Sequence, residues 1–199
     1  MMPKKVQIKK NKKIIYIINN TSFFVSHRLE IAKKAREKGH DVFLITGRNH
    51  NSYQEKLAVN KVKYLKIPHK IFKFSQNINN PIFEIIGLIQ IIIFIKNVKP
   101  DIIHSASPKA NFLSIVSLFF FRKTKLIMAV SGLGTLFTNK QTILRNIIKT
   151  IFKIILKIGF KILNIHVIFQ NKYDLKIFKE ILANSKFKYN IIPGSGLNV

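Results

Sequence analysis

Residues 13–47, KIIYIINNTSFFVSHRLEIAKKAREKGHDVFLITG, contain the unit that predicts the fold. The apolar, β-branched runs at 13–19 and 41–46 predict two buried strands. Between them, residues 23–38 predict a helix, because apolar side chains recur there at a spacing of three. Gly39 stands where a helix commonly ends before a strand. The stretch therefore predicts a strand–helix–strand unit, the building block of a parallel sheet.

The same alternation continues along the rest of the chain. Further strands are predicted at 62–67, 101–105, 125–131, 166–170 and 189–193. Further helices are predicted at 50–58, 82–98, 108–121, 141–164 and 172–183. This pattern predicts an α/β fold with a Rossmann-like, doubly wound parallel sheet of about seven strands. Ligands are then expected at the carboxyl ends of the strands.

Helix starts also have local signals. Ser107 is a good N-cap and Pro108 suits the first helical position. Asn171 is a second N-cap candidate, with Asp174 three residues later in an imperfect capping box. These residues predict where two of the helices begin.

The composition is strongly basic. With 35 Lys and Arg against 8 Asp and Glu, the net charge of +27 indicates an anionic partner or surface. Only five of the 35 are arginine, so a skewed coding composition is an alternative cause. The chain has no cysteine, which excludes disulfides and thiolate chemistry, and the six histidines lack metal-ligand spacing. We expect no metal site.

The apolar segments are short. The run IIYII near the start is shorter than a signal-peptide core, and the longest uncharged apolar run, Ile85 to Ile95, has eleven residues. A bilayer span needs roughly 18. We therefore expect neither a secretion signal nor a membrane-crossing segment.

The loop after the first predicted strand contains no glycine, which argues against a dinucleotide cradle of the G-x-G-x-x-G type. Asn20, Ser26, His27 and Arg28 instead offer hydrogen-bonding groups and a cation beside a helix start. Such groups suit sugar hydroxyls or a phosphate. The alternative is that they only cap the helix.

Two later loops carry further candidates. His104 at a strand end and Lys109 in the first turn of a capped helix could hold an anion. Alternatively, His104 is a core residue and Lys109 a solvated surface charge. Gly132 and Gly134 would let the backbone approach a ligand or another domain closely, although an ordinary turn has the same composition.

A cationic row marks the segment 141–164. Its members, spaced four residues apart, are Arg145, Lys149, Lys153, Lys157 and Lys161. A helix with this row can lie on an anionic membrane with its lysines toward the headgroups. Equally, it can be a buried helix with a solvated lysine edge.

Five motifs together resemble one family. They are NTSFFVSHRLEIAKKAREKGHDVFLITG, VKPDIIHSASPKANFLSI, MAVSGLGTLF, HVIFQNKYDLKIF and IIPGSGLNV. Their order and spacing resemble the N-terminal domain of glycosyltransferase family 4 enzymes. The likeness runs from about Lys13 to Val199 and is greatest to the bacterial branch that adds hexose or N-acetylhexosamine units to polyprenyl-linked saccharides.

The resemblance implies a GT-B enzyme, in which two Rossmann-like domains face each other across a cleft. The N-terminal domain mainly meets the acceptor, and the second domain grips the nucleotide-sugar donor. The implied reaction retains the anomeric configuration and uses neither metal nor cofactor. The residues implied on the acceptor side are Asn20, Ser26, His27, Arg28, His104 and Lys109. Those implied at the cleft or the hinge are Gly132, Gly134, Thr135, Gly194, Ser195 and Gly196.

The sequence also departs from the family pattern. Asn19 and Asn20 stand where many members have two glycines, and Ser131 and Gly132 stand where many have a histidine. No catalytic residue is therefore assigned. The donor-binding domain, with its paired glutamates, has no counterpart among the 199 residues.

We accordingly expect a basic extension at 1–12, an acceptor-side domain at 13–193 and the start of a hinge at 194–199. The expected role is the acceptor-binding half of a glycosyltransferase of cell-surface polysaccharide or lipopolysaccharide assembly, transferring no sugar alone. The expected partners are a polyprenyl-linked saccharide, a nucleotide sugar and an anionic membrane surface, with no nucleic acid. The expected location is cytoplasmic and peripheral, at the inner face of the cell membrane. The alternative is a non-catalytic membrane-anchoring or binding subunit of a two-chain transferase.

Overall fold

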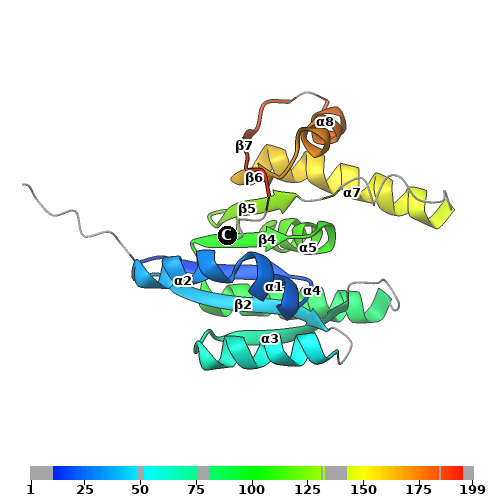
Figure 1. Ribbon diagram of the computed structural model, residues 1–199. Helices are drawn as coiled ribbons and strands as arrows, with labels where there is room; N and C mark the ends of the chain where they lie inside the picture. Colours follow the sequence, from blue (N-terminus) through cyan, green and yellow to red (C-terminus); the bar gives the residue numbers. More distant parts are fainter. Residues whose placement is uncertain are drawn as a thin grey trace, which may run out of the picture.

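The strands form one parallel sheet in the order β3-β2-β1-β4-β5-β6-β7 (Figure 1). The computed structural model describes residues 11–48, 52–75, 81–130, 132, 143–183 and 185–194. The strands are β1 (Lys13–Ile18), β2 (Asp41–Arg48), β3 (His69–Ser75), β4 (Ile102–Ala106), β5 (Lys125–Val130), β6 (Ile165–Phe169) and β7 (Lys188–Ile191). The helices are α1 (Thr21–His27), α2 (Leu29–Glu37), α3 (Tyr53–Tyr64), α4 (Pro81–Val98), α5 (Pro108–Leu118), α7 (Ile143–Ile162) and α8 (Lys172–Ile181). The predicted doubly wound α/β fold is confirmed.

The sheet separates two apolar cores. Ile14, Tyr16 and Ile18 of β1 belong to the core beneath α1, α2 and α3. Ile15 and Ile17 point to the other face, because side chains alternate along a strand. That second core lies between the sheet and helices α4, α5, α7 and α8.

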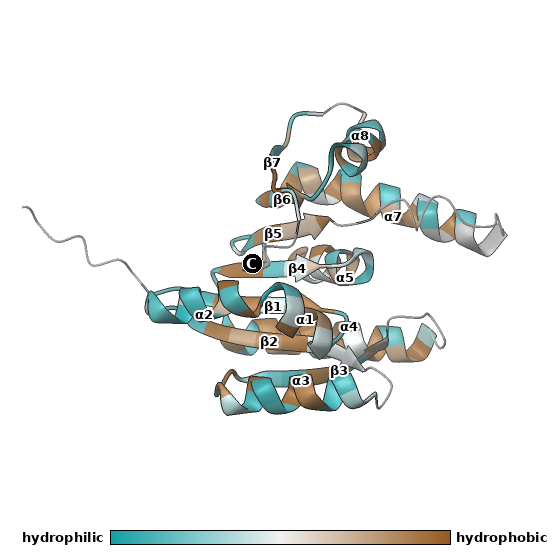
Figure 2. Ribbon diagram, viewed as in Figure 1, coloured by the Kyte–Doolittle hydropathy of each residue, from teal (hydrophilic) through white to brown (hydrophobic). Residues whose placement is uncertain are grey.

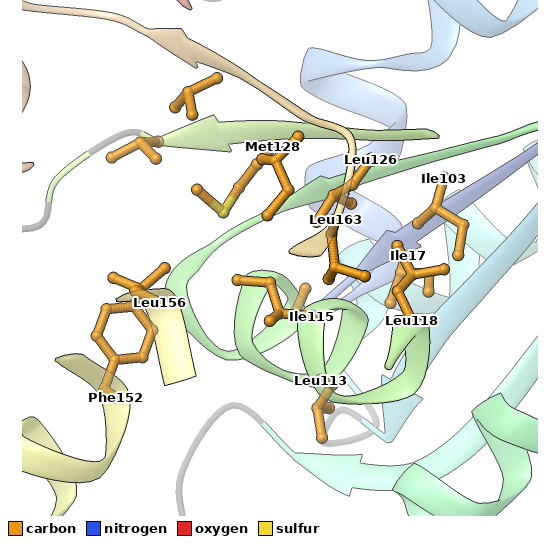
Figure 3. Close-up of a cluster of buried hydrophobic side chains, with 14 of the residues drawn as sticks. Ile17, Ile103, Leu113, Ile115, Leu118, Leu126, Met128, Phe152, Leu156 and Leu163 are labelled. Atoms are coloured by element: carbon orange, nitrogen blue, oxygen red, sulfur yellow. The ribbon is translucent and has the colours of Figure 1, made fainter. Parts of the chain in front are cut away.

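Helix α5 is the centre of the second core. Figure 3 shows its Ile115 and Leu118 on the side of the helix that faces Ile103 and Leu126 of the sheet, and Leu113 on the opposite side of the helix. Most residues of α5 are buried and the others are half-buried, so its neighbours cover much of the helix. It contacts α4 on one side and α7 on the other.

The predicted helix boundaries with local signals are confirmed. Ser107 is the N-cap of α5 and accepts a hydrogen bond from Ala110 N, and Pro108 is the first residue of that helix. Asn171 caps α8, with its Oδ1 accepting from Asp174 N at 2.7 Å. Gly39 follows α2 with a φ of +82°, a conformation that glycine adopts without steric cost.

Two predictions about elements are wrong. The strand predicted at 62–67 begins inside α3, and Val62 packs from that helix into the core below it. The third strand lies instead at His69–Ser75, where it pairs with β2. The helix predicted at 23–38 is two helices, because Arg28, with φ −132° and ψ −12°, interrupts it.

The predicted boundaries of the extension and the hinge stay predictions, since residues 1–10 and 195–199 lie outside the described residues.

Candidate functional site

The strand order reverses between β1 and β4, which makes their carboxyl ends the switch point of the sheet. Ser107 Oγ donates a hydrogen bond to Asn19 Oδ1 across this point at 2.6 Å, and Gly47 N donates to Asn19 O at 3.1 Å. The ends of β1, β2 and β4 are thereby linked. Ser107 has φ +91° and ψ 150°, a strained conformation for a residue with a side chain. Such strain concentrates at functional sites.

The start of α1 already has protein acceptors. Asn20 Oδ1 accepts from Phe23 N at 2.8 Å. The carboxylate of Glu55, from α3, accepts from Thr21 N at 2.7 Å and from Ser22 N at 2.9 Å. A protein carboxylate therefore occupies the place where a phosphate would meet the first turn of this helix.

A hydrogen-bonded network continues from Glu55 along the edge of the sheet. Burial raises the pKa of Glu55, but the hydrogen bonds from Thr21 and Ser22 lower this pKa by more, so the carboxyl is ionised at neutral pH. Thr46 Oγ1 lies 2.8 Å from His69 Nε2. Burial lowers the pKa of His69, against the opposing charge of Glu55, which favours a neutral imidazole.

Arg28 and His104 lie together below this edge, on the face covered by α1 and α2. The rings of His104 and Tyr16 stack with centroids 5.1 Å apart. The exposed fractions of Arg28 and His104 are 6% and 7%. Arg28 Nη1 donates to His27 O at 2.8 Å, whereas Arg28 Nε and His104 Nε2 have no hydrogen-bond partner in the described part of the chain.

The electrostatics of this cluster leave one buried cation. Burial, together with the smaller effect of the Arg28 charge, lowers the pKa of His104 to about 3. Burial raises the pKa of Tyr16 to about 12, with Arg28 opposing the change. No carboxylate of the described residues forms an ion pair with Arg28. A buried guanidinium without a counter-ion favours an anionic ligand.

Ser26 and His27 lie at the opposite end of α1 from Asn20, separated by roughly 9 Å of helix axis. Ser26 Oγ lies 2.6 Å from His27 Nδ1, and the imidazole stacks on Phe23 with centroids 4.3 Å apart. Both side chains are on the exposed surface of the helix. The structure therefore does not bring them together with Asn20.

Lys109 is held by an ion pair. Its Nζ lies 3.0 Å from Glu84 Oε1, and both side chains are largely buried between α5 and α4. The partner of this cation is thus an internal carboxylate. The alternative of a solvated surface charge does not describe it.

Gly132, just after β5, is held by Asp174, a residue that the sequence motifs did not assign to the site. Gly132 N donates to Asp174 Oδ2 at 2.8 Å, and Asn171 Nδ2 donates to the same oxygen at 2.9 Å. Asp174 is 1% exposed. Gly132 has a φ of +90°, which glycine accommodates.

The remaining predicted site residues divide in two. Gly194 is exposed, with a φ of +75°. Gly134, Thr135, Ser195 and Gly196 lie outside the described residues. Within the part of the chain that is described, no group of three or more His, Asp or Glu side chains could hold a metal ion.

A seven-stranded parallel sheet with its polar residues at the switch point is the architecture of a Rossmann-like domain of a GT-B glycosyltransferase. Residues 13–171 match the family model described as "Glycosyl transferase 4-like". The chain belongs to this glycosyl transferase 4-like family and is the N-terminal type of domain.

Solved structures share the fold. A glycosyltransferase from Rickettsia africae ESF-5 matches with a TM-score of 0.62 at 19% identity, over 92% of this chain and 43% of that one. A sucrose-phosphate synthase from Thermosynechococcus elongatus matches with a TM-score of 0.58 at 10% identity, over 92% and 48% respectively. The chain thus spans less than half the length of each. A comparison with curated proteins gives no significant match.

Proposed function

We propose that this domain binds the acceptor in a retaining, metal-independent transfer of a hexose or N-acetylhexosamine from a nucleotide sugar to a polyprenyl-linked saccharide. The transfer would serve the assembly of cell-surface polysaccharide or lipopolysaccharide. Membership of the glycosyl transferase 4-like family supports the transfer of a sugar.

The observation that carries the acceptor role is the contact between Glu55 and the start of α1. Thr21 N and Ser22 N, which could bind a nucleotide diphosphate, both donate to this carboxylate. The donor diphosphate is then held elsewhere. The match covers only 43% and 48% of the two neighbours, which leaves room in an enzyme of their length for a second domain that binds the donor.

The acceptor proposed here is anionic, because a polyprenyl-linked saccharide carries its sugar on phosphate or diphosphate. The buried guanidinium of Arg28, without a carboxylate partner, suits such a group. His104, neutral and with a free Nε2, can hydrogen-bond a hydroxyl or a phosphate oxygen beside it.

Binding measurements on the purified chain test this assignment. We expect farnesyl-diphospho-N-acetylglucosamine to bind at least tenfold more tightly than UDP-N-acetylglucosamine, and Arg28→Met to remove most of that preference. The matched control is Arg36→Met on α2, which should leave both affinities unchanged. Equal or tighter binding of the nucleotide sugar would overturn the acceptor role.

The proposed location is the cytoplasmic face of the cell membrane, with the domain bound peripherally. Lys153, Lys157 and Lys161 form an exposed row on α7, and Lys149 is half-exposed. The side chain of Arg145 lies outside the described residues. Attraction of this row to anionic lipid gives binding that weakens as salt is added. Vesicle binding with no salt-dependent component would contradict the role of the lysine row.

A further inference from the structure

Helix α4 exposes isoleucine where a helix of a soluble domain normally exposes polar residues. Ile82, Ile85, Ile89 and Ile93 are 64%, 58%, 49% and 53% exposed. The helix is long and apolar enough to cross a membrane by length and composition, and only Gly87, Ile91 and Ile95 of its residues are buried. Its outer face is therefore an exposed apolar stripe.

The inner face of α4 is fixed to the sheet. Ile91 and Ile95 belong to the core, and Gln90 Oε1 accepts from Lys73 N of β3 at 2.8 Å. A Cβ placed on Gly87 would lie 2.8 Å from Lys73 O, so helix and strand are in close contact there. This packing keeps α4 on the domain, which makes it a surface helix and not an independent membrane span.

Helix α7 carries a second stripe. Ile147, Ile151, Ile154, Ile158 and Ile162 follow one side of the helix and are 40–51% exposed. Phe152 and Leu156 point into the core instead. Figure 2 shows α7 with brown hydrophobic segments alternating with teal ones, where the exposed lysines lie beside the isoleucines.

The two stripes belong to one face of the molecule. Helices α4, α5 and α7 all pack on the same side of the sheet, with α5 between the other two and in contact with both. Four residues of α5 are half-buried and none is exposed, so the exposed isoleucines of this layer come from α4 and α7, although α8 packs on the same core. Helices α1, α2 and α3 cover the opposite side (Figure 1).

The charges of this layer favour one kind of occupant. The only acidic residue in the segments 81–98, 108–118 and 143–162 is Glu84, and it is paired with Lys109. Exposed lysines border the isoleucines at positions 96, 153, 157 and 161. A second copy of the chain would bring lysine against lysine. An anionic bilayer complements both the apolar stripes and the cations.

We propose that the outer faces of α4 and α7 together lie in the interfacial region of an anionic bilayer. The isoleucines enter the boundary between headgroups and acyl chains, and the lysines contact the headgroups. This inference rests on the proposed function, which brings the domain to a membrane, and it adds the surface and the orientation. The side of the sheet covered by α4, α5 and α7 faces the lipid, and the side covered by α1, α2 and α3 faces the cytoplasm.

Two double variants test the surface at matched exposure. Ile89→Ser with Ile154→Ser removes two side chains that are 49% and 50% exposed on the proposed surface. Ile31→Ser with Leu57→Ser removes two that are 49% and 50% exposed on the opposite side. Sedimentation with phosphatidylglycerol–phosphatidylcholine vesicles should show at least a tenfold loss of affinity for the first pair and less than twofold for the second. Equal losses, or no loss in either, would overturn the proposal.

The absence of native cysteine allows a second measurement that does not depend on affinity. An environment-sensitive fluorophore at Ile89→Cys should be quenched by quencher-labelled lipid, and the same fluorophore at Ile31→Cys should not be. Dimerisation of the wild type that disappears in Ile89→Ser/Ile154→Ser while vesicle binding is retained would assign the surface to self-association and overturn the proposal. The Ile89→Ser/Ile154→Ser variant should bind the farnesyl-linked analogue in solution as tightly as the wild type does. Binding of the analogue thus tests the acceptor proposal, and vesicle binding tests the membrane surface.

Discussion

The side chain of Ser107 donates a 2.6 Å hydrogen bond to the side chain of Asn19, joining the carboxyl ends of β4 and β1 at the switch point of the sheet. The same hydroxyl caps α5, and the backbone of Ser107 is in a conformation that residues other than glycine rarely adopt. Ser107 therefore caps a helix, links the ends of two strands by a hydrogen bond and has a strained backbone.

Replacing Ser107 separates these effects. Ser107→Ala loses the hydrogen bond that caps α5 and the hydrogen bond to Asn19, but it keeps the strained backbone. We therefore expect it to lower the free energy of unfolding by about 2 kcal/mol. Ser107→Gly loses the same bonds but relieves the positive φ, so its loss should be smaller by about 1 kcal/mol. Urea unfolding at pH 7 measures both. A glycine variant less stable than the alanine variant would show that the backbone is not strained there.

Glu55→Gln tests the carboxylate at the start of α1. The amide keeps one acceptor oxygen and turns an NH₂ group toward a second donor, so we expect a loss of about 1–3 kcal/mol at pH 7. The pKa of Glu55 is lowered in the folded state, so the stability it contributes is present above its ordinary pKa and lost as pH falls through the folded value. The difference between wild type and variant should therefore shrink in acid. Glu30→Gln, at an exposed pair with Lys33, is the control and should leave the unfolding midpoint nearly unchanged.

His104 should make the wild type sensitive to mild acid. Because burial lowers its folded pKa to about 3, the unfolded state takes up a proton near the ordinary histidine pKa, well before the folded state does. Stability is complete above that pKa and is lost as pH falls from there toward 3. His104→Phe keeps a ring beside Tyr16, and we expect it to lose about 2 kcal/mol less than the wild type between pH 7 and pH 5. Urea unfolding at the two pH values measures this, with the surface variant His27→Asn as control. Equal losses in His104→Phe and the wild type would contradict the prediction.

Two helical glycines should respond differently to alanine. A Cβ at Gly87 meets the backbone carbonyl of Lys73, at 2.8 Å from the oxygen, whereas a Cβ at Gly159 meets only the Ile115 Cγ2 methyl at that distance. Backbone cannot rotate away, so we expect Gly87→Ala to destabilise the fold by about 2 kcal/mol. Gly159→Ala should destabilise the fold less, because the gain in helix propensity offsets part of the cost of displacing one methyl group. Thermal unfolding ranks the two, and the reverse order would show that α4 is free to move on the sheet.

The elements with strong local signals are those that the sequence predicts well. Ser107 and Pro108 give the start of α5, and Gly39 gives the end of α2. The strand predicted at 62–67 is wrong because the apolar residues of VKYLKI, at 62, 64, 65 and 67, fit either a strand or a helix over six positions. Tertiary packing decides the matter there, since Val62 is buried from a helix whose N-cap, Ser52, lies ten residues earlier.

The candidate site is predictable only in part, because its organising carboxylates act over long sequence separations. Asn20 follows a predicted strand, so its place at the carboxyl edge of the sheet could be expected. Glu55 reaches Thr21 across 34 positions, and Asp174 reaches Gly132 across 42. No local spacing marks either contact. Nor can a hydropathy pattern tell the exposed isoleucines of α4 and α7 from buried ones.

The carboxylate of Glu55 competes with any free phosphate for the backbone N–H groups in the first turn of α1. A group fixed in place has an effective concentration well above the millimolar values of flexible tethers, and a free phosphate would have to displace it at that concentration. A chain with a net charge of +27 attracts anions over its whole surface, the nucleotide included. At this one turn, mass action favours the tethered carboxylate, so a strongly cationic domain need not bind a free phosphate there.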